Sequence, residues 1–397
     1  MKKSQIRRYI AILALCAALF PSTALASSPL VTAQPLPGMP PVTNPSDIYA
    51  ADRPNALSPV VKDFPSRVYV PNHTSNTVTE IDPKTFKVIR TFAVPKGPQH
   101  VVPSWDLKTL WVNDDEGNHL TPIDPMTGLP GKSIYVHDPY NLYFTPNGKY
   151  AMVMAEADKE IVFRDPHTMA IKKILKVACD GINHADFTAD GNFFVASCEF
   201  SGQLVLVNTA KMSVVKYFTL PSKYLDGKFL PTYQHMNAAD APTPQDVKIS
   251  PDGKTFYIAD MMENGLWVMP ADNFGKVSFI HTGTEAHGLY VTRDSKYLLI
   301  SNRGEGSVSV LRFSDNKLVS KWKIPGGGSP DMGGISADGT QFWVSGRYDN
   351  VVYVFDFSNG VIHGKFLRSI KVGKEPHGLA FYPQPGRYSL GHTGVFR

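Results

Sequence analysis

Two short segments of the chain place a histidine in nearly the same surroundings. Residues 285–291 read EAHGLYV and residues 375–381 read EPHGLAF, so His287 and His377 share one local pattern. Neutral imidazole is the commonest protein ligand for transition metals, and several converging imidazoles suit copper, zinc or iron. Two alternatives follow. The histidines hold a metal together, or a structural element repeats and each histidine only packs or forms hydrogen bonds.

Other reactive side chains are few. The chain has no CxxC, CxxCH, HExxH or GxSxG motif, and Gly131-Lys132-Ser133 lacks the upstream glycine of a phosphate loop. Outside residues 1–26, the cysteines are Cys179 and Cys198. The sequence therefore contains no catalytic signature, and a metal site or a polar pocket is the chemistry left to consider.

The first residues have the features of a signal peptide. Four basic residues precede an apolar run at 9–20, and Ala24-Leu25-Ala26 is a small-x-small cleavage signal. We predict a signal peptide at 1–26 and a periplasmic or secreted protein, with Sec and twin-arginine export both open. In an oxidising compartment a Cys179–Cys198 disulfide is the first choice, and thiolate metal ligands are the second.

Charge and hydropathy limit the partners. Without residues 1–26 the chain has 36 basic and 35 acidic residues, so it lacks the excess of positive charge that binds nucleic acid. No later apolar run is long enough to span a membrane. We expect no nucleic-acid partner, no membrane span and a monomer.

The rest of the chain repeats four short β-rich runs separated by turns such as TPNGKY (145–150), SPDGKT (250–255) and SADGTQ (336–341). Positions aligned to these turns lie 41 to 46 residues apart, with one spacing of 62, and they are His100, Asn141, His184, Asp246, Gly288, Met332 and Gly378. Four strands with their turns need about 40–45 residues, which predicts the blades of a β-propeller.

The two ends of the repeat complement each other. The run at 377–383 has no blade after it, and the first blade lacks an inner strand before 67–71. Pairing of these runs would close the ring and remove exposed sheet edges. We therefore predict an all-β fold, a seven-bladed β-propeller of four-stranded antiparallel blades over 63–397. A Pro-rich extended arm without a core of its own precedes it at 27–62, and the long spacing is an insertion at 221–244.

Four segments carry a resemblance to a known family. VYVPNHTSNTVTEIDPKTFKVIRTFAV (68–94), ISPDGKTFYIAD (249–260), ISNRGEGSVSVL (300–311) and EPHGLAF (375–381) resemble the YVTN-repeat β-propellers, which include YncE-like and surface-layer-like proteins. The resemblance runs over 64–383. It implies a seven-bladed propeller related to quinoprotein amine dehydrogenases and haem d1 domains, in which the HGL element recurs as architecture. It implies no catalytic residue set, because propellers serve as binding modules and enzymes alike.

In such a propeller, the loops that enter the inner strands lie on one face. The candidate metal ligands there are His100, His184, His287 and His377, near the mouth of the central channel. However, the last two fall one residue earlier than the first two, and one residue of offset reverses side-chain direction on a strand. Packing and metal binding therefore both remain open. If a metal binds, its affinity should fall as pH drops through about 6.5.

The same face collects charged residues. Arg303 and Arg347 occupy matching places in adjacent blades and could clamp an anion. Asp246, and His235 in the insertion, complete a candidate ligand pocket. The alternative is that polar residues are simply favoured in solvated turns.

Two classes of function follow. The first is an exported binding or interaction protein that uses the channel mouth for a small ligand or a periplasmic protein, with a transition metal as candidate cofactor. The second is a metal- or cofactor-dependent oxidoreductase, or a lactonase-like hydrolase, with its active site at the same mouth.

Overall fold

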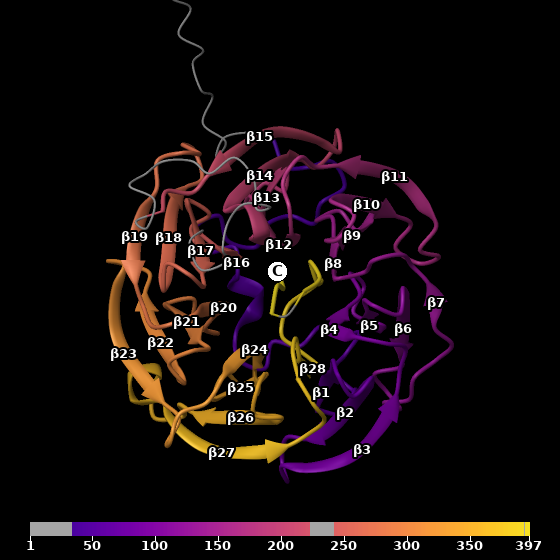
Figure 1. Ribbon diagram of the computed structural model, residues 1–397, viewed down its shortest axis with the longest axis vertical. Coiled ribbons are helices and arrows are strands. Elements are labelled where there is room, and N and C mark those ends of the chain that lie inside the picture. The colour runs from indigo at the N-terminus through magenta and orange to yellow at the C-terminus, as the bar shows by residue number, and fades with distance from the viewer. Residues whose placement is uncertain (1–33, 223–241, 393) are drawn as a thin grey trace, which may run out of the picture.

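The computed structural model describes residues 34–222, 242–392 and 394–397, and these form a ring of seven four-stranded antiparallel sheets (Figure 1). The predicted seven-bladed propeller is thereby confirmed. Within the described ranges, the helical segments are short 3₁₀ helices: η1 (Ala50–Asp52), η2 (Glu199–Ser201) and η5 (Val361–His363).

The blades follow one another along the chain. Blade 1 contains β28 (Ala380–Tyr382), β1 (Arg67–Asn72), β2 (Thr77–Asp82) and β3 (Lys87–Ala93). Blade 2 contains β4 (Pro98–Pro103), β5 (Leu110–Asp114), β6 (His119–Ile123) and β7 (Ile134–Tyr135). Blade 3 contains β8 (Asn141–Phe144), β9 (Ala151–Ala155), β10 (Glu160–Arg164) and β11 (Ile171–Lys176). Blade 4 contains β12 (Ile182–Phe187), β13 (Phe193–Cys198), β14 (Gln203–Asn208) and β15 (Ser213–Thr219).

The remaining blades have the same order. Blade 5 contains β16 (Pro244–Ile249), β17 (Thr255–Asp260), β18 (Gly265–Pro270) and β19 (Ser278–His281). Blade 6 contains β20 (Ala286–Val291), β21 (Tyr297–Asn302), β22 (Ser307–Arg312) and β23 (Lys317–Lys323). Blade 7 contains β24 (Pro330–Ile335), β25 (Gln341–Gly346), β26 (Val351–Asp356) and β27 (Lys365–Lys371).

The ring closes as predicted. Strand β28 pairs with β1 in antiparallel register, with Tyr382 opposite Arg67 and Ala380 opposite Tyr69. The last strand of the chain therefore completes the first blade. Without β28, the inner edge of β1 would be left unpaired where the ring closes.

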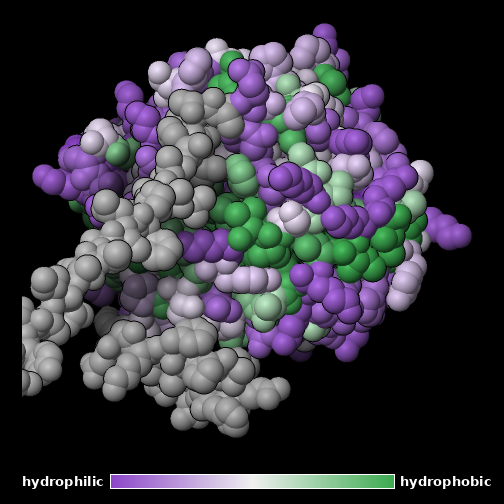
Figure 2. All heavy atoms as spheres, turned by 90° about the horizontal axis from the view of Figure 1, so that it is seen from above, coloured by the Kyte–Doolittle hydropathy of each residue, from purple (hydrophilic) through white to green (hydrophobic). Residues whose placement is uncertain are grey.

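Burial explains the residue pattern of the strands. Second strands such as β9 (AMVMA) are buried throughout, because both of their faces pack against neighbouring blades. Outer strands such as β3 and β11 are largely exposed, and Figure 2 shows the rim edge-on as mostly hydrophilic with a hydrophobic band. Lysines lie among the exposed apolar side chains of β11, as is usual for edge strands.

The N-terminal arm runs across the face opposite the histidine-bearing loops. Backbone amides of Leu36, Ile48 and Asn55 donate hydrogen bonds to turns of blades 4, 5 and 7, each at 2.8 Å. The side chains of Ile48 and Tyr49 are buried in the blade core. The described part of the arm, from residue 34, therefore packs on the propeller, and residues 27–33 lie outside the described residues.

The chain after β28 turns inward, and its end lies at the centre of the ring in Figure 1. Phe144 N donates to Leu390 O (2.9 Å) and His392 N donates to Leu142 O (2.9 Å), so this tail (residues 383–397) adds to the inner edge of blade 3. Arg397 lies over the ring of Tyr49 in the arm. The tail and the arm together occupy the channel on the side opposite the predicted mouth.

A disulfide links Cys179 to Cys198, with their Cα atoms 5.8 Å apart, which confirms the predicted pair. Both cysteines belong to blade 4, where the disulfide joins the loop before β12 to the end of β13. It therefore anchors the approach to an inner strand. None of the helices in the described part of the chain is long and apolar enough to cross a membrane.

Candidate metal centre

The inner strands line the channel, and five of them carry an extra residue near its mouth. The register of β4 against β5 shifts between Pro98 and Val101, and β12, β16, β20 and β24 shift at equivalent places. Such a β-bulge sets two residues opposite one and re-aims their side chains. Consecutive residues such as Gln99 and His100 can therefore both reach the channel.

Two layers of channel residues result. The upper layer, nearer the mouth, is formed by Gln99, Tyr140, Asn183, Gln245, His287, Asp331 and His377. The lower layer is formed by His100, Asn141, His184, Asp246, Gly288, Met332 and Gly378. The one-residue offset therefore places His100 and His184 in the lower layer and His287 and His377 in the upper layer.

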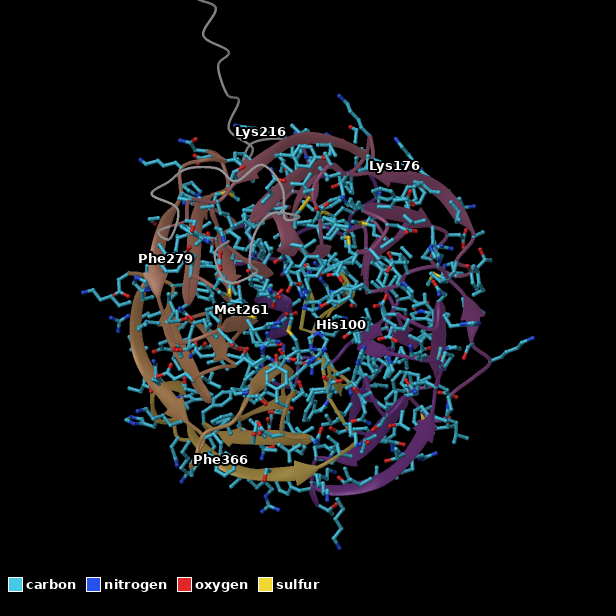
Figure 3. The ribbon with its side chains drawn as sticks, in the orientation of Figure 1. His100, Lys176, Lys216, Met261, Phe279 and Phe366 are labelled. Carbon is cyan, nitrogen blue, oxygen red and sulfur yellow. A yellow bond between two sulfur atoms is a disulfide. The ribbon has the colours of Figure 1, made fainter. Side chains whose placement is uncertain are left out.

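Three fully buried histidines meet in the lower layer. His100, His184 and His392 each offer a ring nitrogen, and these nitrogens lie within 4.8 Å of one another. Their ring centroids are 5.9 Å apart for His100 and His184, 5.2 Å for His100 and His392, and 4.8 Å for His184 and His392. Figure 3 shows His100 near the centre of the ring. The three residues are close enough to hold one metal ion.

Gly378 makes room for His100. A Cβ atom at position 378 would lie 2.1 Å from Cδ2 of His100, which no real contact allows. The backbones of the two residues also form an isolated bridge. Blade 1 therefore needs a glycine here, because the imidazole of blade 2 lies directly against it.

His100 is arranged as a metal ligand. Its Nδ1 donates to the backbone oxygen of Tyr140 at 3.0 Å, which leaves the lone pair on Nε2. That Nε2 is buried and has no hydrogen-bond partner among the described residues. Burial, followed by the neighbouring His392, lowers the pKa of His100 to about 3, so the ring is neutral. A backbone acceptor on one nitrogen and a free lone pair on the other is the usual arrangement of metal-bound histidine.

Asn141 joins the other two rings. Its Nδ2 lies 3.3 Å from Nδ1 of His184 and 3.0 Å from Nδ1 of His392, so one amide donates to both. Nε2 of His392 lies 3.5 Å from Asp246 Oδ1, on the side where that nitrogen carries its proton. With a metal on Nε2 of His184, the proton of that ring would move to Nδ1, where the amide oxygen of a rotated Asn141 would accept it. After this rotation the Nδ1 lone pair of His392 would bind the metal in place of the Asn141 amide, while its Nε2–H stays toward Asp246.

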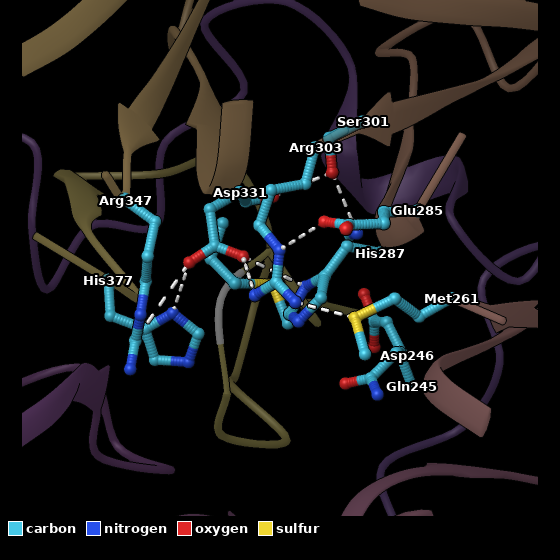
Figure 4. A network of polar contacts seen from close by, with 12 residues as sticks. Gln245, Asp246, Met261, Glu285, His287, Ser301, Arg303, Asp331, Arg347 and His377 are labelled. Carbon is cyan, nitrogen blue, oxygen red and sulfur yellow. Dashed lines mark hydrogen bonds and ion pairs between the residues drawn. The ribbon is translucent and has the colours of Figure 1, made fainter. Parts of the chain in front are cut away.

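Asp331 organises the upper layer (Figure 4). His377 Nδ1 donates to it at 2.6 Å, His287 Nδ1 lies 3.2 Å away, and Arg303 Nη1 and Arg347 Nη1 lie at 3.4 and 3.9 Å. Burial alone would raise the pKa of the Asp331 carboxyl, but the surrounding histidines and Arg303 outweigh it and hold this pKa well below its usual range. Asp331 is therefore an ionised carboxylate that fixes the ring of His377 by a hydrogen bond and lies beside the ring of His287.

A carboxyl pair lies on the other side of the mouth. Asn183 Nδ2 donates to Glu156 Oε1 at 3.1 Å and to Glu199 Oε2 at 2.6 Å. Burial raises the pKa of Glu156 well above its usual value, and the nearby Glu199 raises it further. Burial raises the pKa of Glu199 as well. The pair therefore holds a proton at higher pH than exposed carboxyls would.

The predicted ligands divide between the two layers. His100 and His184 lie in the three-histidine cluster, whereas His287 and His377 lie on Asp331, with 4.8 Å between the ring centroids of His377 and His100. Of the predicted pocket residues, the two arginines contact Asp331 and Asp246 contacts His392. His235 and most of the insertion at 221–244 lie outside the described residues.

The sequence reasoning missed His392. The pattern search stopped at the closing strand, and residues 384–397 have no blade to align with. The available signal was a histidine between two glycines, Gly391 and Gly394, which both adopt positive φ, at 90° and 75°. Such a pair marks a tight reversal. Here the reversal carries the tail into the channel, against β8.

The comparisons with known proteins agree with this fold. A family model described as YNCE-like beta-propeller matches residues 36–219 and 237–385. No curated protein matches the chain in sequence.

The three solved structures described next are below 25% identity, so they show a likeness in fold alone. The periplasmic gluconolactonase of Pseudomonas aeruginosa is 16% identical over 81% of this chain and 99% of its own, with a TM-score of 0.61. The hydrazine synthase of Kuenenia stuttgartiensis is 17% identical over 71% of this chain and 88% of its own, with a TM-score of 0.56. Dihydro-heme d1 dehydrogenase NirN in complex with DHE is 12% identical over 82% of this chain and 76% of its own, with a TM-score of 0.57.

A match to that family model over most of the sequence, together with the seven closed blades, assigns the chain: it belongs to the YNCE-like β-propeller family.

Proposed function

We propose that this protein is an exported metal-binding propeller, and that His100, His184 and His392 hold a transition metal in its central channel. The observation that carries the proposal is the approach of three fully buried imidazole nitrogens to within 4.8 Å of one another. Nε2 of His100 and Nε2 of His184 are buried without a hydrogen-bond partner among the described residues, and burying such atoms unpaired is costly, so these two rings call for a shared partner.

The donor set narrows the metal. Imidazole nitrogens suit zinc, copper and iron, whereas calcium and magnesium prefer oxygen ligands. Three protein nitrogens leave at least one coordination position for an outside ligand, as in metal sites that bind or transform small molecules. The protein is therefore proposed to bind a small ligand at the channel mouth through the metal.

Export is part of the proposal. The features of residues 1–26 support it, and so does the disulfide of blade 4, because disulfides persist mainly in oxidising compartments. A periplasmic setting would also expose the site to the extracytoplasmic metal supply.

A zinc and copper titration of tag-free protein tests the proposal. Wild type should bind one equivalent, and His392→Ala should bind at least ~10–100-fold more weakly, which is the loss expected even for partners outside the coordination sphere. His281→Ala, on the exposed outer strand β19, is the matched control and should bind as wild type does. Equal affinity in His392→Ala and wild type, or no binding by wild type, would end the proposal.

An enzymatic role is a second candidate, and the Glu156–Glu199 pair favours it. Carboxyls with raised pKa beside a metal site are suited to general acid–base catalysis. A panel of lactones and redox dyes, assayed with and without zinc or copper, tests this candidate. An enzymatic role predicts metal-dependent turnover that Glu199→Gln reduces. Turnover equal to the metal-free background would contradict this role.

A further inference from the structure

Two arginines from adjacent blades face the channel mouth, but they are engaged to different extents. Arg303 is held on every side: Nε donates to Glu285 at 3.3 Å, Nη1 to Asp331 at 3.4 Å, and Nη2 lies against the sulfur of Met261. Its guanidinium also lies over the ring of Tyr348. Each of the three guanidinium nitrogens of Arg303 therefore already has a partner.

Arg347 is held much more loosely. Its Nη1 lies 3.5 Å from Gln99 Oε1 and 3.9 Å from Asp331 Oδ2, both long contacts. No hydrogen bond or ion pair with a described residue involves its Nε or Nη2. Guanidinium has five N–H donors in a planar fork that matches carboxylate and phosphate. Most of this fork is available at the mouth.

The carboxylates near Arg347 already have other partners. Glu375 contacts Thr74 and His73, and Glu199 accepts from Asn183 at 2.6 Å. Asp331 is shared among two histidines and Arg303. The positive charge of Arg347 is therefore only partly balanced by the protein.

Arg347 also lies close to the metal cluster. Figure 4 shows its guanidinium beside the ring of His377, and the centroid of that ring is 4.8 Å from the centroid of His100. Nε2 of both histidines is buried and has no hydrogen-bond partner among the described residues. One imidazole thus separates the free guanidinium donors from the proposed metal position.

We infer that Arg347 binds a small oxyanion, a carboxylate or a phosphate, at the channel mouth, where the anion serves as the outside ligand of the metal. The anion site stands on the geometry of Arg347 alone, whereas its coupling to the metal rests on the proposed function. Cation and anion bind cooperatively, because each neutralises charge that the other brings into a low-dielectric channel.

The experiment measures the affinity of acetate and of inorganic phosphate by calorimetry, with and without zinc. Wild type should bind one of these anions weakly without zinc and about 10-fold more tightly with it. Arg347→Gln should weaken anion binding at least about 10-fold in both states, because a charge-assisted bidentate contact is lost. Its zinc affinity without added anion should stay equal or rise. Arg312→Gln, which breaks an exposed pair with Asp315, is the matched control.

Each outcome separates the claims, provided that thermal melting shows Arg347→Gln to be folded. Loss of anion binding only in Arg347→Gln supports the site, and the preferred anion identifies the class of ligand. Equal anion binding by Arg347→Gln and wild type, or none by wild type, overturns it. If zinc fails to bind while the anion still depends on Arg347, the metal centre falls and the anion site stands. If zinc binds without changing anion affinity, the coupling is wrong.

Discussion

Burial sets the chemistry of the channel histidines. It lowers the pKa of His100 and of His287 to about 3, and it holds the pKa values of His184, His377 and His392 well below their usual range. Neutral rings keep lone pairs for a metal. The sequence analysis took the ordinary imidazole pKa of about 6.5 for the metal ligands, and burial lowers that of His100 to about 3.

Metal affinity should therefore change little between pH 7 and pH 5. At pH 5 a metal would have to displace protons from ordinary imidazoles, but not from rings whose pKa is near 3, as for His100. We expect the zinc dissociation constant to rise by less than about 10-fold over this interval. Competition with a chromogenic chelator measures it. A steep loss that tracks a pKa near 6.5 would place the metal on exposed histidines instead.

Asp331→Asn should destabilise the fold by about 3 kcal/mol, because it leaves the buried Arg303 short of a counter-charge. We expect no larger loss of stability, because Arg303 keeps its ion pair with Glu285. Urea unfolding at pH 7 measures this loss. The exposed Asp315→Asn serves as control and should not change the midpoint measurably. If both variants unfold at the wild-type midpoint, Asp331 is not the organising charge of the upper layer.

The inner strands show what patterning could and could not predict. The turns and the period identified the blades and the closing strand, because each blade buries the same faces. They also brought His100, His184, His287 and His377 to one channel. Strict alternation of side chains along a strand could not show that all four histidines reach the channel. The β-bulges that re-aim the side chains appear only in the register between paired strands. His392 lies beyond the last repeat, where no pattern applied.

Gly378→Ala tests how the segment just before β28 positions the ring of His100, which belongs to blade 2. The added methyl would overlap His100 and tilt its ring away from the cluster. We expect zinc affinity to fall about 10–100-fold, as for other changes just outside a coordination sphere. Gly334→Ala on inner strand β24 is the control, because its methyl would meet neighbours only at 3.4 Å or more. Wild-type affinity in Gly378→Ala would mean that His100 is not a ligand.

Across the propeller, buried carboxyls make stability depend on pH. Burial raises the pKa of Asp52 to about 7 and that of Asp114 to about 8, above their values in the unfolded chain. At a pH between the unfolded-state pKa and the raised folded-state pKa of such a carboxyl, the folded state binds more protons than the unfolded state. The free energy of unfolding therefore falls as pH rises. Above pH 7.5 the histidines are almost entirely neutral in both states and add little slope.

We therefore expect the free energy of unfolding to fall by about 1 kcal/mol between pH 7.5 and pH 9. Asp114→Asn, which can still accept from Thr121, should flatten most of this slope and become more stable than wild type at pH 9. Chemical unfolding at the two pH values measures both effects. A wild type that is more stable at pH 9 would show that these carboxyls are ionised in the folded protein.

The ring brings together, in one channel, a histidine from blade 2, another from blade 4 and a third from the C-terminal tail, far apart in sequence. The most direct measurement of what they do is anomalous diffraction from crystals grown with zinc. We expect one channel peak bonded to His100, His184 and His392, with zinc–nitrogen distances of about 2.0–2.1 Å. A channel without a peak, with zinc only on surface histidines, would contradict it.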